Sequence, residues 1–361
     1  GHIFWDELFI LPLYNLHYPE TARGSLLYRY RRLDVARAYA RAHGYDGAMY
    51  PWQSGSDGRE ETPLVHLNPI SGEWGDDHSS LQRHVSLAII YGVWDYFQTT
   101  QDIEFLRDYG AEMFIELARF WASISAFNPE AGRYEIAGVM GPDEFQEKYP
   151  GATTGGIKDN SYTNIMVAWL MRTTAQVLIL IGTDARRQVA AKTGLEEEES
   201  EAWGDIAARL NLCISDDGIV EQFDGYFGLQ ELDWDGYRQK YGRIGRMDRL
   251  LRAEGQSADD FKVAKQADAL MPFYVLPDHE LRKILSSLGH EPASDLLARN
   301  FDYYLERTSH GSTLSRLVHA DLANRAGHPQ ISWDLYRWAL RSDFADTQGG
   351  TTKEGIHAGV M

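Results

Sequence analysis

Apolar residues recur at every fourth position through two long stretches of the chain, a spacing that places them on one face of an α-helix. The first series consists of Leu81, Val85, Ile89, Val93 and Phe97, and the second of Phe105, Tyr109, Met113, Leu117 and Trp121. We therefore expect two consecutive amphipathic helices, each of which buries its apolar face.

Residues 160–182 are apolar nearly all round, and Gly182 follows as a C-terminal stop. This segment is expected to be an inner helix that is buried on several sides. Further helices are expected between Gly-, Pro- and Asp-rich loops, at residues 24–43, 186–213, 258–275, 279–288, 292–305, 313–325 and 329–340. Strand signals are few and short. The pattern favours one all-α domain over residues 1–361.

Composition narrows the class of protein. With 43% hydrophobic residues, a chain of 361 residues can bury a large core. The single cysteine, Cys213, excludes an internal disulfide, so the cytoplasm is the expected location. A net charge of −18 disfavours nucleic acid as a partner, and we identify no apolar run that approaches the ~20 residues of a membrane helix. The sequence lacks an initial Met and is expected to be one piece of a longer protein.

The first candidate for chemistry is a loop rich in carboxylates that lies between two apolar segments, at residues 141–164. A carboxyl group on a rigid loop is the commonest general acid for cleaving a glycosidic bond. Glu144 is our candidate for this acid, with Asp143 and Glu147 as neighbours that could tune it. Two alternatives stay open: Glu144 could be an ordinary exposed carboxylate, and Asp143 could be a structural cap of the loop.

Aromatic residues in polar loops suggest carbohydrate binding, because sugars stack their apolar faces on such rings. Trp52 and Arg59 lie in the polar loop 50–61, and Trp5 and Asp6 lie near the start of the chain. The alternatives are a surface loop with Trp52 packed beneath it, and a helix N-terminus for the segment that includes Asp6.

Three further segments offer groups for an anion or a sugar. Ser312 and Thr313 lie where a Gly-containing loop leads into an expected helix, an arrangement that could bind phosphate, although plain N-capping is the more common role of such residues. The glycine-rich segment 349–357 ends in His357. Lys265 and Gln266 lie within an expected helix, where an exposed face is the ordinary explanation.

Taken together, these segments resemble those of glycoside hydrolase family 65, which comprises inverting disaccharide phosphorylases and a few hydrolases. The resemblance rests on FWDE, YPWQSGSDGREET, GVMGPDEF, DNSYTN, KQAD, SHGSTLS and DTQGGTTKEGIH, at residues 4–7, 50–62, 138–145, 159–164, 265–268, 309–315 and 346–357. It implies an (α/α)6 barrel of six inner and six outer helices, with the sugar pocket at one end. The β-domains that flank this barrel in the family are not in this sequence, and Phe145 stands where Tyr is usual.

The resemblance also implies roles for individual residues. Glu144 matches the general acid. The residues that match glucose-binding segments are Trp5, Asp6, Trp52, Arg59, Lys265 and Gln266, and those that match phosphate-binding groups are Ser312, Thr313 and His357. We expect inorganic phosphate as a co-substrate, no cofactor and no metal. A small carbohydrate is the expected partner, and the family implies a homodimer.

The expected activity is inverting phosphorolysis of an α-glucoside to β-glucose 1-phosphate and a released acceptor. An inverting hydrolase is the first alternative, with Glu354 or Glu60 as the base that activates water. A catalytically silent sugar-binding or scaffold protein is the second. Linkage and acceptor are left open by the sequence.

Overall fold

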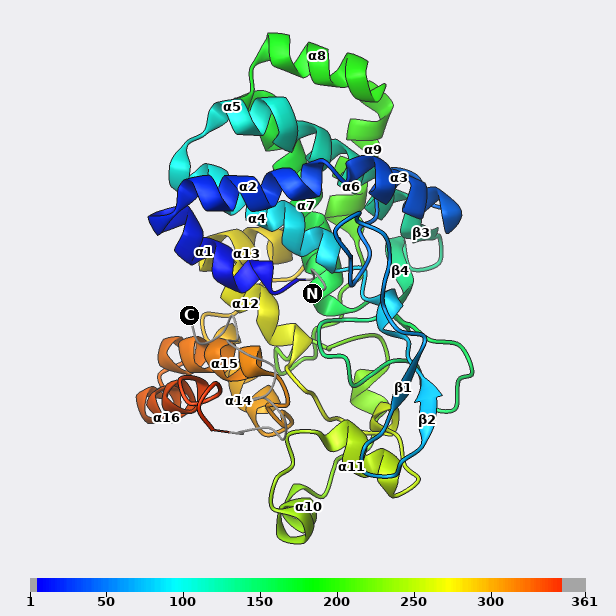
Figure 1. The fold of residues 1–361 in the computed structure, drawn as a ribbon, viewed down its shortest axis with the longest axis vertical. Helices are drawn as coiled ribbons and strands as arrows, with labels where there is room; N and C mark the ends of the chain where they lie inside the picture. Colours follow the sequence, from blue (N-terminus) through cyan, green and yellow to red (C-terminus); the bar gives the residue numbers. More distant parts are fainter. Residues whose placement is uncertain (1–4, 346–361) are drawn as a thin grey trace. The chain divides into compact units, whose positions relative to one another are not determined.

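Helices dominate the computed structural model, which describes residues 5–345 (Figure 1). The helices are α1 (Glu7–His17), α2 (Pro19–Tyr30), α3 (Leu33–Ala42), α4 (Val85–Thr100), α5 (Ile103–Phe105), α6 (Ala111–Ile124), α7 (Ser161–Leu180), α8 (Thr183–Thr193), α9 (Glu197–Arg209), α10 (Trp234–Tyr241), α11 (Met247–Ala253), α12 (Met271–Val275), α13 (Asp278–Ser287), α14 (Leu296–Leu305), α15 (Thr313–Arg325) and α16 (Pro329–Ala339). The expected mostly helical fold is therefore confirmed for the described residues.

The strands are short, as the sequence predicts. They are β1 (Val65–Leu67), β2 (Trp74–Asp76), β3 (Ser125–Asn128), β4 (Arg133–Val139) and β5 (Ile157–Lys158). β1 and β2 form an antiparallel hairpin in which His66 is paired with Gly75 and Leu67 with Trp74. This hairpin becomes one wall of the cavity described below.

The chain divides into two compact units, which we describe separately. The first contains residues 1–62, 82–137 and 163–211, and the second contains residues 63–81, 138–162 and 212–361. In the first unit α1 and α2 pack against α4, and α6 contacts α4, α8 and α9. In the second unit α15 packs against α16, α14 and α12, and α15 and α16 run side by side (Figure 1).

Helix α7 is the inner helix that the sequence predicts at residues 160–182. It has 20 residues, and an 18-residue window within it has a mean hydropathy of 1.2, so by length and composition it could cross a membrane. Our expectation that no segment approaches these values is wrong for α7. However, 72% of that window is buried inside the structure, which is the environment of a core helix.

Two of the longer expected helices are each divided in two. The segment 24–43 forms α2 and α3, and the segment 186–213 forms α8 and α9. The second break has a clear cause: Gly194, at φ +66°, ends α8 in the left-handed conformation, and Glu196 and Glu199 form a capping box that begins α9.

The helix expected at residues 258–275 is largely wrong, since only α12 and short 3₁₀ turns form there. The backbone amides that would build it are used elsewhere. Those of Lys265 and Gln266 donate to Asp143 Oδ1, and that of Asp268 donates to Gln222 Oε1. Contacts distant in sequence therefore override the local helical pattern.

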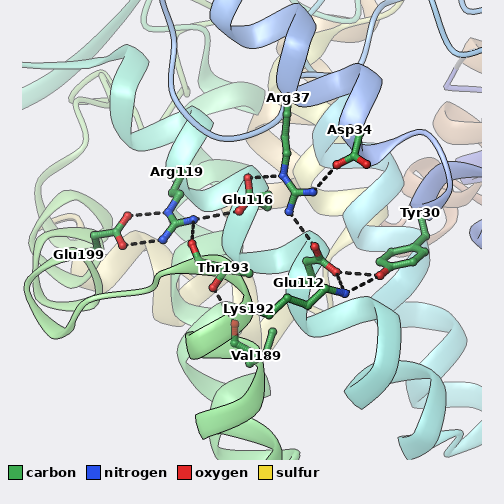
Figure 2. A network of polar contacts seen from close by, with 10 residues as sticks. All are labelled: Tyr30, Asp34, Arg37, Glu112, Glu116, Arg119, Val189, Lys192, Thr193 and Glu199. Carbon is green, nitrogen blue, oxygen red and sulfur yellow. Dashed lines mark hydrogen bonds and ion pairs between the residues drawn. The ribbon is translucent and has the colours of Figure 1, made fainter.

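A network of charged side chains joins α3, α6 and α9 within the first unit (Figure 2). Glu112 and Glu116 on α6 are almost fully buried, and Arg37 of α3 contacts both, at 2.8 and 3.0 Å. Arg119 connects Glu116 to Glu199 of α9. Burial alone would raise the pKa of Glu112, but hydrogen bonds headed by that from Arg37 hold the pKa below its ordinary value. These pairs offset the cost of burying the carboxylates.

Candidate active site

The loop that carries Glu144 is held in a strained backbone conformation. Glu144 has φ +67°, a region that costs a non-glycine residue about 1–2 kcal/mol. Among the described residues, the non-glycine residues with positive φ are Gln101, Glu144, Asp159 and His310. Three of these lie in segments that the sequence singles out for chemistry, and Gln101 ends α4.

Asp143 anchors this loop from inside the protein. Its side chain is buried, with Oδ1 accepting hydrogen bonds from the amides of Lys265 (2.5 Å) and Gln266 (3.4 Å). Its Oδ2 accepts one from Gln222 Nε2 at 3.0 Å. The open alternative for Asp143, a structural loop cap, is the one that these contacts support.

A second set of buried amides and carboxylates supports the same loop. Asn160 Nδ2 donates to Asp268 Oδ2 at 2.6 Å, and Gln266 Nε2 donates to the Pro142 carbonyl at 2.8 Å. A Cβ atom at Gly141 would overlap both Asp268 Oδ2 and Asn160 Nδ2. Only glycine lets the backbone approach this pair so closely, so the GPDEF segment begins with a residue that its packing requires.

Glu144 points towards the lysine that the sequence assigns to the sugar site. Lys265 Nζ lies 2.7 Å from Glu144 Oε2, and the two side chains are 16% and 30% exposed. The carbonyl of Lys265 accepts a hydrogen bond from the Gly311 amide at 3.2 Å. The structure thus brings the GPDEF, KQAD and SHGSTLS segments together within the second unit.

Two buried carboxyl groups lie behind the loop. Burial raises the pKa of Asp143, and the nearby charge of Asp268 raises it further. Burial likewise raises the pKa of Asp268 to about 8, although hydrogen bonds from Asn160 and from the Asp143 backbone oppose this shift. The pair therefore retains a proton in the neutral pH range.

This retained proton makes the stability of the fold depend on pH. Between pH 4 and pH 8 the folded protein binds more protons at Asp268 than the unfolded chain does. The free energy of unfolding therefore falls as pH rises through this window, by at most about 1.4 kcal/mol per pH unit for one proton. Asp268→Asn should remove this contribution. Urea denaturation from pH 4 to pH 8 should show the variant gaining stability relative to the wild type as pH rises, and a constant difference would contradict the pKa assignment.

Glu144 and Lys265 line a cavity of about 530 Å³ within the second unit. The hairpin β1–β2 contributes His66 and Asp76, and α11 contributes Arg249 and Arg252. The sequence analysis did not predict that α11 and the β1–β2 hairpin line this cavity. For α11 the spacing of the arginines at positions 246, 249 and 252 would have indicated a basic helical face.

Glu147 also lines this cavity, and it is largely buried. Burial raises the pKa of Glu147 to about 8, with further contributions from the charges of Asp259 and Asp77. Asp259 Oδ1 accepts hydrogen bonds from the amides of Glu147 and Lys148 at 2.9 and 3.2 Å. The Glu147 carboxyl group is thus mostly uncharged at neutral pH. It lines the same cavity as Glu144.

The aromatic residues predicted to bind sugar lie together in the first unit. Trp5 and Trp52 are both buried, with ring centroids 6.3 Å apart, and each ring also packs against His84. Asp6 precedes α1 at its N-cap position without a side-chain cap, so the helix-start alternative holds in part. Arg59 is 79% exposed and contacts Asp57.

The structure describes Ser312 and Thr313, two of the three residues predicted to bind phosphate. Ser312 is the N-cap residue, and its Oγ accepts a hydrogen bond from the Leu314 amide at 3.2 Å. Thr313 is the first residue of the helix. His310 Nδ1 lies 2.9 Å from Ser315 Oγ. His357 and Glu354 lie outside the described residues.

Lys265 and Gln266 do not lie on a helix, contrary to the sequence pattern. They form a bend, and Gln266 is buried rather than exposed. Glu60, one candidate base for hydrolysis, is already engaged in the first unit: its Oε2 accepts from Tyr39 Oη at 2.8 Å and its Oε1 from the Thr62 amide at 2.9 Å.

Comparisons with known proteins place these features in context. The sequence model of the glycosyl hydrolase family 65 central catalytic domain matches residues 1–361. An uncharacterized glycosyl hydrolase of Mycobacterium tuberculosis is 48% identical over 361 residues, covering 100% of this chain and 27% of that protein. Trehalose 6-phosphate phosphorylase of Lactococcus lactis is 45% identical over 363 residues, covering 100% of this chain and 45% of that protein.

A solved structure of a candidate kojibiose phosphorylase from the human microbiome has a TM-score of 0.82 and 24% identity, and it covers 100% of this chain and 48% of that one. This likeness shows that the fold is shared. The chain spans between about a quarter and a half of the length of the relatives it matches.

Proposed function

Because the chain belongs to glycosyl hydrolase family 65, we propose that it cleaves an α-glucoside with inorganic phosphate and inverts the configuration at the anomeric carbon. The products are β-glucose 1-phosphate and the released acceptor. The Lactococcus lactis relative, named as a phosphorylase and 45% identical over the whole chain, supports this reaction.

One geometric observation carries the proposal. Glu144 pairs with Lys265, whose backbone bonds to Gly311, two residues before the N-terminus of α15. The free amides and hydroxyl groups at a helix N-terminus suit an anion. A candidate acid and a candidate phosphate seat therefore occur in one connected group of segments, as phosphorolysis requires.

In the proposed mechanism, Glu144 protonates the glycosidic oxygen as the acceptor leaves. Phosphate is already an anionic nucleophile, so it needs positioning on the opposite side of the anomeric carbon rather than a general base. In the structure Lys265 Nζ forms an ion pair with Glu144, 2.7 Å from its Oε2. We propose that sugar hydroxyl groups redirect this ammonium when substrate binds, so that Glu144 can carry a proton.

The proposal extends to the barrel formed by the helices and to the roles of individual residues. We propose that the helices form the (α/α)6 barrel of the family, with residues 1–361 as one catalytic domain. Trp5, Asp6, Trp52, Arg59, Lys265 and Gln266 are assigned to glucose, and Ser312, Thr313 and His357 to phosphate. A homodimer and a cytoplasmic location stay predictions, as do the absence of a cofactor and of a metal.

The dependence of turnover on phosphate tests this function. We expect the purified protein to consume an α-linked glucobiose or its phosphate ester only when inorganic phosphate is present, because phosphate is the nucleophile. Product release is measured with and without phosphate for a panel of linkages. Turnover at equal rates in phosphate-free buffer would instead indicate a hydrolase, and glucoside binding without any turnover would indicate a silent binding protein.

A further inference from the structure

Helix α11 has an apolar face, which packs into the core, and a basic face, which lines the cavity. Met247, Leu250 and Leu251 are buried in an apolar cluster that also contains Phe145, the neighbour of Glu144. The arginines on the other face, Arg246, Arg249 and Arg252, line the cavity that contains Glu144. Burial of the apolar face thus fixes the direction of three guanidinium groups.

The row of arginines runs away from the proposed phosphate seat. At one end, the Gly245 carbonyl, next to Arg246, accepts a hydrogen bond from Ser309 Oγ at 3.0 Å. With a rise of about 1.5 Å per residue, the backbone of Arg249 lies about 4.5 Å further along α11 and that of Arg252 about 9 Å further. The far end of the row is therefore separate from the segment that leads to Ser312.

Arg252 defines this far end against the β1–β2 hairpin. Its Nη1 lies 2.6 Å from His66 Nε2, and a Cβ at Gly75 would overlap its guanidinium group. Burial and the charge of Arg252 lower the pKa of His66, so the neutral imidazole accepts a hydrogen bond from the arginine. The paired residues His66 and Gly75 thus form the surface on which Arg252 rests.

Two acidic groups of the cavity are paired with cations other than Arg252. Arg246 is paired with Asp248, and Lys265 with Glu144, whereas Arg252 forms no ion pair with a carboxylate of residues 5–345. Glu147, whose charge would act on Arg252, has its pKa raised to about 8 by burial and by Asp259 and Asp77. At neutral pH this carboxyl group is mostly protonated.

Two further carboxylates of this part of the cavity, those of Asp77 and Asp259, have partners of their own. Asp77 lies 3.8 Å from His66 Nδ1 and accepts from the Ser79 amide, and Asp259 accepts from two backbone amides and from Ser257 Oγ. Arginine is suited to bidentate recognition of phosphate oxygens. A group of this kind in a sugar cavity fits an anionic substituent of the substrate.

We propose that Arg249 and Arg252 bind a phosphate ester carried by the acceptor part of the glucoside, so that the substrate class is a phosphorylated α-glucobiose. This inference rests on the proposed phosphorolysis, because that reaction defines the released sugar as the acceptor in the synthetic direction. Inorganic phosphate is the other source of the same chemistry, and our proposed mechanism assigns it to the opposite end of the row, near residues 309–313.

The test uses the synthetic direction, with β-glucose 1-phosphate as donor and phosphate release as the readout. Glucose 6-phosphate and glucose are compared as acceptors. We expect kcat/KM to be at least 100-fold higher for glucose 6-phosphate. Arg249→Gln should raise the KM for glucose 6-phosphate at least 10-fold and reduce the preference for glucose 6-phosphate over glucose by a similar factor. Arg249 is chosen because Arg252 also supports the hairpin.

Arg238→Gln is the matched control, since Arg238 lies on α10 in the same unit, outside the cavity lining, and pairs with exposed Asp235. Equal use of both acceptors, or an Arg249→Gln effect confined to the KM for inorganic phosphate, would overturn the inference and leave the proposed phosphorolysis standing. Calorimetry gives a readout independent of turnover. Binding of glucose 6-phosphate but not glucose, weakened in Arg249→Gln, supports the site even if no turnover occurs, and equal binding by both proteins overturns it.

Discussion

Glu144→Gln should lower kcat/KM for phosphorolysis of an α-glucobiose by about 10³-fold, within the range of 10²–10⁴ that a positioned general acid contributes. The glutamine keeps the size of the side chain and can still accept a hydrogen bond from Lys265, but it cannot deliver a proton to the leaving oxygen. Steady-state kinetics at saturating phosphate measure the loss.

The identity of the leaving group separates loss of the acid from loss of the fold. α-Glucosyl fluoride needs little protonation on departure, so the variant should retain most of its phosphate-dependent activity on this substrate. Glu147→Gln is the matched control, because Glu147 lies three residues away in the same cavity and is mostly uncharged at neutral pH. Glu144 would not be the acid if Glu144→Gln lowered activity on the fluoride as much as on the glucobiose, and if Glu147→Gln caused the same losses.

Asp143→Ala should destabilise the protein by about 3 kcal/mol. Three buried donors would lose their acceptor, namely the amides of Lys265 and Gln266 and the Gln222 side chain. Each such loss costs about 1–3 kcal/mol, and relief from burying a carboxyl group offsets part of the total. The variant should also lose activity, because the same contacts position Glu144. Urea denaturation at pH 7 measures the stability.

Asp235→Ala provides the comparison for this effect, because the Asp235 side chain is 96% exposed and forms an ion pair with Arg238 on the same helix. Its change in stability should stay within about 0.5 kcal/mol. A similar small change for Asp143→Ala would show that the loop does not depend on Asp143.

The helices that local patterns specify are those that the sequence predicts well. Residues 160–182 match α7, and residues 313–325 match α15, because burial all round and an N-cap are both visible in the sequence. Where local and distant contacts compete, the prediction fails. At Lys265 and Gln266 the helical pattern is overridden by a carboxylate about 120 residues earlier in the chain, which no local pattern can reveal.

The candidate site shows the same division. Residue types and their resemblance to a family point to Glu144 and Lys265, and the structure places these side chains 2.7 Å apart. The cavity wall formed by α11 and the β1–β2 hairpin was not predicted. The two three-residue strands carry little periodicity, and on the seven-residue α11 the signal is confined to the spacing of its arginines. The contact between Arg252 and His66 joins positions 186 residues apart.

The configuration of the first product tests the proposed reaction most directly. Proton NMR in the first minutes of turnover, with phosphate present, distinguishes the two anomers of glucose 1-phosphate before any equilibration. We expect β-glucose 1-phosphate to form in step with the released acceptor and to disappear in Glu144→Gln. Formation of α-glucose 1-phosphate, or of glucose at a rate independent of phosphate, would contradict inverting phosphorolysis at this site.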